Sequence, residues 1–390
     1  MKARYPIQDQ VAIVGVGTTE YSRDSGKSEL GLVAEASRAA IRDAGLTAKD
    51  IDGIAGSWVR AELVQGALGI PAVNYYLNTI LPPFQGQVIA GMNAVFAGLC
   101  ETVLVYHSGY RTAVASRSAA ADPFRVPRRS RLRPLSPMPD TINGTVCYAT
   151  WADRYLHEYG ATREDLGLIA INNRSNAVHN DHAVQRDPLT MEGYLAGRMI
   201  REPLNLFDMD YPVDGSDALV ITTAERARDL TDTPVLLHVA VDGQTSHAVE
   251  EDMPDLTQTG LKAAADNLWA RTDLSLDDVD VYMPYDGFSI IQLKWFESIG
   301  YCGVGEAPAF LKKHWNADEN RIEINGRVLV NPHGGSLSEG ASQGAGHIRE
   351  AVRQLRGQGS GLQVEGAKTA LVTPGGFFYN AGALLLRTES

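Results

Sequence analysis

The sequence predicts an α/β protein that is built from two similar halves. Short apolar segments typical of buried strands alternate along the chain with segments that have the apolar periodicity of helices. Two stretches from the first part of the chain return, in the same order, in its last part. Residues 46–52 match residues 274–280 in character, and residues 98–105 resemble residues 366–372. The copies lie much further apart than solenoid repeats, so we interpret them as two halves with the order helix, strand, helix, strand.

The first half is expected to open with a buried strand over residues 11–16 and a helix that begins after Ser28 and ends at Gly45. A second strand is expected around residues 51–55. Residues 88–99 carry small side chains and no charge, which favours a helix packed on all sides, and a strand follows over residues 102–106.

The middle of the chain departs from this order. Residues 109–143 are rich in Arg, Ser, Pro and Ala and show no sustained period, so we expect an excursion from the core that serves as a substrate loop. Regular structure then resumes. The expected elements are helices over residues 148–159 and 164–178, strands over 218–222 and 236–241, and a helix over 260–270.

A glycine-rich turn over residues 331–346 is the candidate centre of function. It follows an apolar strand over residues 327–330 and precedes an amphipathic helix over residues 347–356. Glycine lets backbone amides approach a ligand closely, and a helix start offers unpaired donors where negative charge develops. If the halves are duplicates, residues 78–87 are its counterpart and the two helix starts face each other across one active site. The alternative is an ordinary strand-to-helix loop.

The composition excludes several classes of function. Of the 390 residues, 44% are hydrophobic and 21% charged, as in ordinary globular enzymes, and the net charge of −12 argues against a nucleic-acid partner. The cysteines, Cys100, Cys147 and Cys302, form no CxxC pair, so we expect neither a disulfide framework nor a metal site in this chain. We see no secretory signal and no apolar run long enough for a membrane span, and expect a cytoplasmic protein.

Several motifs occur in order along the chain. They are the turn and strand over residues 214–227, Tyr285-Asp-Gly-Phe288, Glu297-Ser-Ile-Gly-Tyr-Cys-Gly-Val-Gly-Glu306, Asn331-Pro-His-Gly-Gly335 and Ser338-Glu-Gly340. Together with the duplication they resemble the thiolase superfamily, most of all its branch of sterol-carrier-protein-type thiolases and lipid-transfer proteins. The resemblance spans essentially the whole chain. It implies a thiolase fold, a duplicated five-layered α-β-α-β-α arrangement with an inserted loop region.

This resemblance implies four segments. Residues 1–108 would form the first part of the N-terminal half, residues 109–205 the inserted region, residues 206–240 the return to the N-terminal half, and residues 241–390 the C-terminal half.

The chain departs from thiolases at each familiar catalytic side chain. Residues 80–85, where a thiolase carries its nucleophilic cysteine, read Ile-Leu-Pro-Pro-Phe-Gln. Ala341-Ser342 replaces the usual His-Pro, and Pro374-Gly375-Gly376 lacks the second cysteine. An acyl-enzyme mechanism therefore has no nucleophile at its usual place. We interpret Cys100, at the far end of the first buried helix, as a core residue.

The branch also includes steroid side-chain acyl-CoA aldolases, which this chain resembles. The resemblance implies a retro-aldol cleavage of a β-hydroxyacyl-CoA into a ketone and propionyl-CoA or acetyl-CoA, with no cysteine nucleophile. It further implies that Tyr285 is the acid/base, while the second tyrosine of the aldolases falls at Ala341. Because the reference pKa of tyrosine is about 10, Tyr285 needs a partner to act as a base. The alternatives are a thiolase-type acyltransferase and a non-catalytic acyl-CoA or sterol carrier, and Tyr285 itself could be a structural hydroxyl.

Other candidate residues surround the glycine turn. His333 has a reference pKa near neutrality and is a further catalytic candidate, or else it bonds the loop backbone. Asp286 orients a neighbour or forms a turn. Gly334, Gly335, Gly376 and Tyr379 are candidates for substrate binding, with a core aromatic as the alternative for Tyr379. We interpret His347, at the helix start, as a solvated or capping side chain.

Partners follow from the same resemblance. In the excursion, positive charge in an acidic protein could hold the phosphates of coenzyme A, or it could be a solvated surface or a partner contact. The residues are Arg125, Arg128, Arg129, Arg131 and Arg133. We expect no cofactor beyond coenzyme A as part of the substrate, a homodimer, and an OB-fold, zinc-ribbon acyl-CoA-binding partner that completes a heterotetramer.

Overall fold

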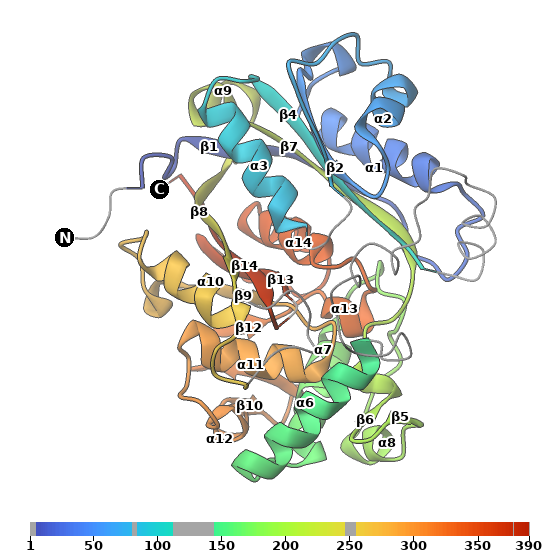
Figure 1. The fold of residues 1–390 in the computed structure, drawn as a ribbon, viewed down its shortest axis with the longest axis vertical. Coiled ribbons are helices and arrows are strands. Elements are labelled where there is room, and N and C mark those ends of the chain that lie inside the picture. The colour runs from blue at the N-terminus through green and yellow to red at the C-terminus, as the bar shows by residue number, and fades with distance from the viewer. Residues whose placement is uncertain (1–4, 80–83, 112–143, 246–254, 377, 390) are drawn as a thin grey trace.

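The central feature of the computed structural model is a twelve-stranded sheet (Figure 1). The structure describes residues 5–79, 84–111, 144–245, 255–376 and 378–389. The N-terminal half contributes β1 (Val11–Thr18), β2 (Gly53–Ser57), β3 (Tyr75–Thr79), β4 (Thr102–Tyr110) and β7 (Asp214–Thr223). The C-terminal half contributes β8 (Val235–Gln244), β9 (Val281–Pro284), β12 (Val328–Val330), β13 (Thr369–Gly376) and β14 (Asn380–Thr388), with β10 (Trp315–Asn316) and β11 (Arg321–Ile324) at the edge.

The strand order is the same in both halves. From the middle outward, the N-terminal half reads β1, β7, β4, β2, β3, and the C-terminal half reads β8, β14, β13, β9, β12. The halves join where β1 and β8 pair antiparallel, with Ala12 opposite Leu236 and Ile13 opposite Val235. The predicted duplication is confirmed. The predicted division at residue 240 stays a prediction, and β8, which pairs with β14 along its length, spans that residue.

Helices form three layers around the two halves of the sheet. The outer helices are α1 (Glu29–Asp43), α2 (Ala61–Leu68) and α9 (Ala224–Leu230) on one side, and α10 (Gly260–Trp269), α11 (Ser289–Ile299) and α12 (Ala307–Lys313) on the other. The middle layer is α3 (Gln85–Phe96) and α14 (Ala345–Leu355), and both contact strands of both halves. Figure 1 shows these two helices between the blue N-terminal half and the orange C-terminal half. The predicted five-layered thiolase fold is confirmed.

The middle layer encloses the core that holds the halves together. Phe84, Val88 and Met92 from the α3 side meet Ile348 and Val352 of α14 in one buried cluster. The helix α1 begins after Ser28, whose side chain accepts a hydrogen bond from the Gly31 amide, as the sequence predicts. The expectation that the small-residue helix is packed on all sides is wrong, since Phe96 at the end of α3 is 46% exposed.

The repeated sequence stretches make the same contacts twice. Each copy forms a short 3-10 helix, η1 (Ala48–Asp50) and η4 (Leu276–Asp278), closed by a capping box. The last aspartate of each copy accepts hydrogen bonds from two successive amides at the start of β4 or β13. The pairs are Asp52 with the amides of Glu101 (3.0 Å) and Thr102 (2.8 Å), and Asp280 with those of Lys368 (2.8 Å) and Thr369 (3.0 Å).

A helical insertion separates β4 from β7. Its described elements are α6 (Gly144–Tyr159), α7 (Arg163–Ala177), α8 (Met191–Leu195), β5 (Met199–Arg201), β6 (Leu204–Asn205) and η2 (Leu206–Asp208). Although it leaves the N-terminal half, the insertion packs on the C-terminal half, where α7 contacts α11, β11 and α13 (Gly335–Ser338). Within the described ranges, no helix has both the length and the apolar character that crossing a bilayer requires.

Candidate active site

The site forms where the ends of two neighbouring parallel strands meet. Tyr285 to Phe288 follow β9, the glycine turn follows β12, and the strands pair in parallel with Leu329 opposite Val281. Because parallel neighbours end at the same edge, the Tyr-Asp-Gly-Phe motif and the turn lie together. The start of α14 closes this edge from the middle layer.

Asp286 organises this edge. Its carboxylate has no exposed surface and accepts hydrogen bonds from the amides of Ser336 (2.7 Å) and Leu337 (2.9 Å), from Nδ2 of Asn173 (2.6 Å) and from Nε2 of His347 (2.9 Å). A buried carboxylate with four donors is a fixed charge rather than a simple turn former. The motif and the turn are thereby fastened to each other.

Steric contacts explain why two successive residues of the turn are glycine. Gly335 has a φ of +61°, and a Cβ there would collide with the carboxylate of Asp286. Gly334 has a φ of +103°, and a Cβ would lie 2.6 Å from Cβ of Ala177. Both positions therefore exclude any larger residue. The expectation of free donors at this turn is wrong for the first amides of α13, which bind Asp286, and for Gly346, whose amide donates to Oγ of Ser342 at 2.9 Å.

Tyr285 is partly exposed and lies beside α14. Its amide donates to the Thr373 carbonyl at 2.9 Å, which anchors the residue to β13, and its ring centroid lies 5.9 Å from that of His347. The phenol folds back over Gly287, where a Cβ would lie 2.6 Å from Cζ and closer still to the hydroxyl. Gly287 thus makes the room that the hydroxyl occupies.

His333 is buried in the turn, and its imidazole has a low affinity for a second proton. Burial, and the charges of His347 and Arg349, hold its pKa well below the usual value, so the ring is neutral. Neither ring nitrogen has a hydrogen-bond partner among the described residues, and Nε2 lies 3.9 Å from Oε2 of Glu339. The ring stands edge-on to His347 at 5.0 Å between centroids. Protonation of a buried imidazole of this kind carries a large free-energy cost.

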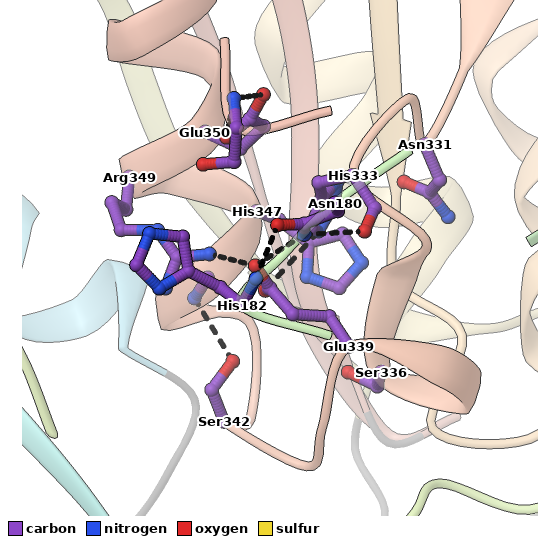
Figure 2. Close-up of polar contacts among 12 residues, drawn as sticks. Asn180, His182, Asn331, His333, Ser336, Glu339, Ser342, His347, Arg349 and Glu350 are labelled. Atoms are coloured by element: carbon purple, nitrogen blue, oxygen red, sulfur yellow. Dashed lines mark hydrogen bonds and ion pairs between the residues drawn. The ribbon is translucent and has the colours of Figure 1, made fainter. Parts of the chain in front are cut away.

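Behind His333 lies a buried ionic network. Figure 2 shows the Glu339 carboxylate between the His333 ring and the Arg349 guanidinium, which donates to it. Oε1 of Glu339 also accepts from Nδ2 of Asn180 at 3.0 Å, and the same amide nitrogen donates to the His333 carbonyl at 2.8 Å. Arg349 reaches on to Oδ1 of Asp217 in β7 at 2.8 Å. The network therefore ties the turn to the other half of the molecule.

The N-terminal half also reaches the turn. A Cβ at Gly109, near the end of β4, would lie 3.0 Å from the Ala341 carbonyl, and Nε1 of Trp58 donates to Oε1 of Gln343 at 3.3 Å. Ser57 Oγ and His107 Nδ1 lie 2.6 Å apart, both buried, on the strand ends that face the turn. The predicted counterpart segment, residues 78–87, is described only in part, because residues 80–83 lie outside the described residues.

The remaining predicted residues lie in different places. Gly376, with a φ of +148°, ends β13, and the neighbouring Pro374 carbonyl abuts Gly344, where a Cβ would collide with it. Tyr379 packs against the core of the C-terminal half, and its carbonyl accepts from the Thr245 amide at 2.8 Å. The predicted coenzyme A contacts Arg125, Arg128, Arg129, Arg131 and Arg133 lie outside the described residues.

Part of the site was not predicted from the sequence. The interpretation of His347 as solvated or capping is wrong, because α14 starts at Ala345 and turns this side chain inward onto Asp286. Three side-chain amides of the insertion that hold the turn were also not predicted: Asn173 on Asp286, Asn176 on the Val330 carbonyl (2.9 Å) and Asn180 on that of His333. Their spacing of three and four residues, a polar stripe at helical period, was the available signal.

Two of the described cysteines, Cys100 and Cys302, are poor nucleophiles. Burial, with Asp52 nearby, raises the pKa of Cys100 to about 12, and a Cβ at Gly53 in β2 would lie 2.7 Å from its Sγ. Burial, with Glu297 nearby, raises the pKa of Cys302 to about 12 as well. Cys147 is buried in α6. The thiolate is the reactive form, so Cys100 and Cys302 stay inert at neutral pH.

Comparison with known proteins places these features in a family. The profile of the thiolase C-terminal domain-like family matches residues 243–388. The 17-hydroxy-3-oxo-4-pregnene-20-carboxyl-CoA lyase of Mycobacterium tuberculosis is 33% identical over 97% of this chain and 100% of its own length. The steroid side-chain-cleaving aldolase of Thermomonospora curvata is 34% identical over 96% of this chain and 97% of its own.

A solved structure supports the same placement. The Ltp2-ChsH2(DUF35) aldolase superposes with a TM-score of 0.85 at 32% identity, covering 98% of this chain and 99% of that one.

Proposed function

This chain belongs to the thiolase superfamily, and we propose that it is a carbon–carbon lyase that cleaves a β-hydroxyacyl-CoA by a retro-aldol reaction. The substrate is the coenzyme A thioester of a steroid side chain, and the products are a ketone and propionyl-CoA or acetyl-CoA. Two relatives of nearly full length carry names that describe steroid side-chain or steroid carboxyl-CoA cleavage, which supports the substrate class.

The reaction needs a base and an acid but no covalent intermediate. The base removes the proton of the β-hydroxyl, the Cα–Cβ bond breaks, and its electron pair moves into the thioester enolate. The hydroxyl carbon becomes the ketone, and the α-carbon then takes up a proton. We assign the base to Tyr285. Its ring packs against the ring of His347, which the hydrogen bond to Asp286 holds in place.

One observation carries the proposal. A phenol, Tyr285, stands on the edge where the glycine turn and the start of α14 meet, burial raises the pKa of the Cys100 and Cys302 thiols to about 12, and Cys147 is buried in α6. An acyltransferase needs a thiolate or an equivalent nucleophile at this place. An inert acyl-CoA or sterol carrier needs no titratable group there.

Turnover of a β-hydroxyacyl-CoA steroid tests the proposal. We expect release of the ketone with propionyl-CoA or acetyl-CoA, and a loss of about 10²–10⁴-fold in kcat on Tyr285→Phe, the usual contribution of general acid–base catalysis. Mass spectrometry of the protein during turnover should find no acyl adduct. An adduct would indicate the acyltransferase, and binding without turnover in all assays would indicate the carrier.

We also propose two partners. The first is a second copy of the chain. Strand β3 ends the sheet with an unpaired edge in the described chain, and Tyr76 on it is 61% exposed, so the edge is suited to pair with its copy. Sedimentation should give a dimer, and Tyr76→Lys should weaken it. The second is an OB-fold, zinc-ribbon protein that supplies the zinc site and is needed for full turnover, which co-expression tests.

A further inference from the structure

The hydrogen bonds of Asp286 decide which nitrogen of His347 carries a hydrogen. Oδ1 of this carboxylate accepts from the Ser336 amide (2.7 Å) and from Nε2 of His347 (2.9 Å). Oδ2 accepts from the Leu337 amide (2.9 Å) and from Nδ2 of Asn173 (2.6 Å). With two donors on each oxygen, the carboxyl group is ionised and has no hydrogen to give. Nε2 of His347 therefore donates, and in the neutral ring Nδ1 carries the lone pair.

The other nitrogen of this ring is left over. Nδ1 of His347 is buried and has no hydrogen-bond partner among the residues that the structure describes. A buried acceptor without a partner is costly, so a histidine that served only to hold Asp286 gains nothing from it. A carboxylate on one ring nitrogen, with the other nitrogen unbound, is the arrangement that prepares a histidine to exchange protons, because the carboxylate orients the ring and stabilises its charged form.

The position of the ring relative to Tyr285 suits the reaction. The β-oxygen and the α-carbon of the substrate are separated by one carbon atom, so the groups that serve them must lie on neighbouring side chains. The rings of Tyr285 and His347 stand nearly perpendicular, with their centroids 5.9 Å apart, and Tyr285 is partly exposed. On another side, His333 lies edge-on at 5.0 Å. Burial and the neighbouring charges hold the pKa of His333 well below its usual value, so it adds no competing positive charge.

We propose that His347 is the second catalytic residue, whose Nδ1 gives the α-carbon its proton, and that Asp286 is the positioning residue that orients it. The inference rests on the proposed function. The β-hydroxyl O–H bond breaks and its proton goes to the Tyr285 phenolate, while the Cα–Cβ electron pair becomes the enolate. The Nδ1–H bond of the His347 imidazolium then breaks and its proton goes to the α-carbon. The phenol returns one proton to Nδ1 afterwards, so a turnover leaves both side chains as they began.

Deuterium exchange into propionyl-CoA tests this role apart from bond cleavage. The group that protonates the α-carbon also removes a proton from it in the reverse direction, so the parent protein in D2O should exchange the α-hydrogens of propionyl-CoA, which mass spectrometry follows. Tyr285→Phe should still exchange them, since no β-hydroxyl takes part. His347→Gln should slow both the exchange and the kcat of cleavage by about a hundredfold or more, the usual range of general acid–base catalysis.

The choice of glutamine separates catalysis from structure. Its terminal amide reaches as far as Nε2 of histidine and can keep the hydrogen bond to Asp286, but it offers no base at the place of Nδ1. A purely structural His347 therefore predicts that His347→Gln keeps its activity. Urea unfolding shows that the variant is folded, and His347→Asn, which also lacks the imidazole, replaces it if it is not. His182→Gln, at an exposed position, is the matched control and should exchange like the parent.

The outcomes distinguish the inference from the proposed function. Exchange in a folded His347→Gln at the rate of the parent would overturn the role of His347, and so would a parent that cleaves the steroid thioester but exchanges nothing. Exchange that is lost in Tyr285→Phe instead would assign both proton transfers to the phenol. If the parent exchanges through His347 but cleaves no β-hydroxyacyl-CoA steroid, the proposed function fails and the acid/base role of His347 stands.

Discussion

At the scale of single residues, the position of the Tyr285 hydroxyl depends on the absence of a side chain at Gly287. Gly287 has an ordinary backbone conformation that alanine can adopt, so its need for glycine comes from the phenol above it. Gly287→Ala should displace the hydroxyl and lower kcat by about tenfold or more, since a shift of the order of an ångström is costly in a positioned catalyst. Stability should change little. Gly66→Ala, at an open site in α2, is the control, and an unchanged kcat would show that the hydroxyl is not where the reaction occurs.

His333 links a single side chain to the stability of the fold in acid. Its pKa is far below the usual value in the folded protein and near 6.5 in the unfolded chain, so only the unfolded chain takes up a proton as the pH falls below 6.5. Stability is therefore lost on the acid side, by about 1.4 kcal/mol for each pH unit. His333→Gln removes this loss, so its unfolding free energy should fall less steeply below pH 6.5. Urea unfolding between pH 7 and 5 measures the difference, and His179→Gln, at an exposed position, should behave like the parent.

At the scale of elements, the two repeated loops are a matched pair of stabilising devices. Asp52 and Asp280 each bind two backbone amides that open a strand. Replacing either by alanine leaves those amides without their acceptor and should cost about 1–3 kcal/mol. Because the sites lie in different halves, the double variant should show the sum of the two losses. Chemical unfolding measures the free energy of unfolding of the two single variants and the double variant. A loss at one site only would mean that the two loops share a structure but that only one of them stabilises the fold.

Helices and strands could be predicted where the sequence marks their ends or gives them a clear apolar pattern. The helix α1 and strand β1 follow their expected bounds closely, because a capping serine, a terminal glycine and an apolar run mark them. The helix α11 carries no such pattern, since all its residues are buried, including an ion pair between Lys294 and Glu297. The exposure of Phe96 on α3 escaped prediction because uncharged side chains do not distinguish a core face from an apolar surface.

At the scale of the whole molecule, the duplication was visible in the sequence but the contacts of the site were not. The turn, the Tyr-Asp-Gly-Phe motif and the candidate Tyr285 were found from ordered motifs. Their supports come from segments that only the fold brings together: Asn173 from the insertion and His347 from α14. No local period connects these residues, so sequence reasoning could name the centre of the site but not its surroundings.

A buried arginine, Arg349, makes charged contacts in both halves. Arg349 leaves α14 of the C-terminal half and binds Glu339 in the turn, and it also meets Asp217 in β7 and the hydroxyl of Tyr21, both in the N-terminal half. All of these groups are buried. The arginine therefore neutralises two carboxylates that belong to different halves, at the point where the halves enclose the turn.

Removing this charge should destabilise the whole molecule. Arg349→Met strands Asp217 and Glu339 without a counter-charge and should cost about 3–5 kcal/mol of unfolding free energy, as other broken buried pairs do. The loss should shrink at acid pH, where the stranded carboxylates take up protons. Arg353→Met, one turn further along α14 and only partly buried, is the control. Urea unfolding gives each value, and adding Asp217→Asn and Glu339→Gln should recover part of the loss. A cost below about 1 kcal/mol would mean that apolar packing in the middle layer, rather than this network, holds the halves together.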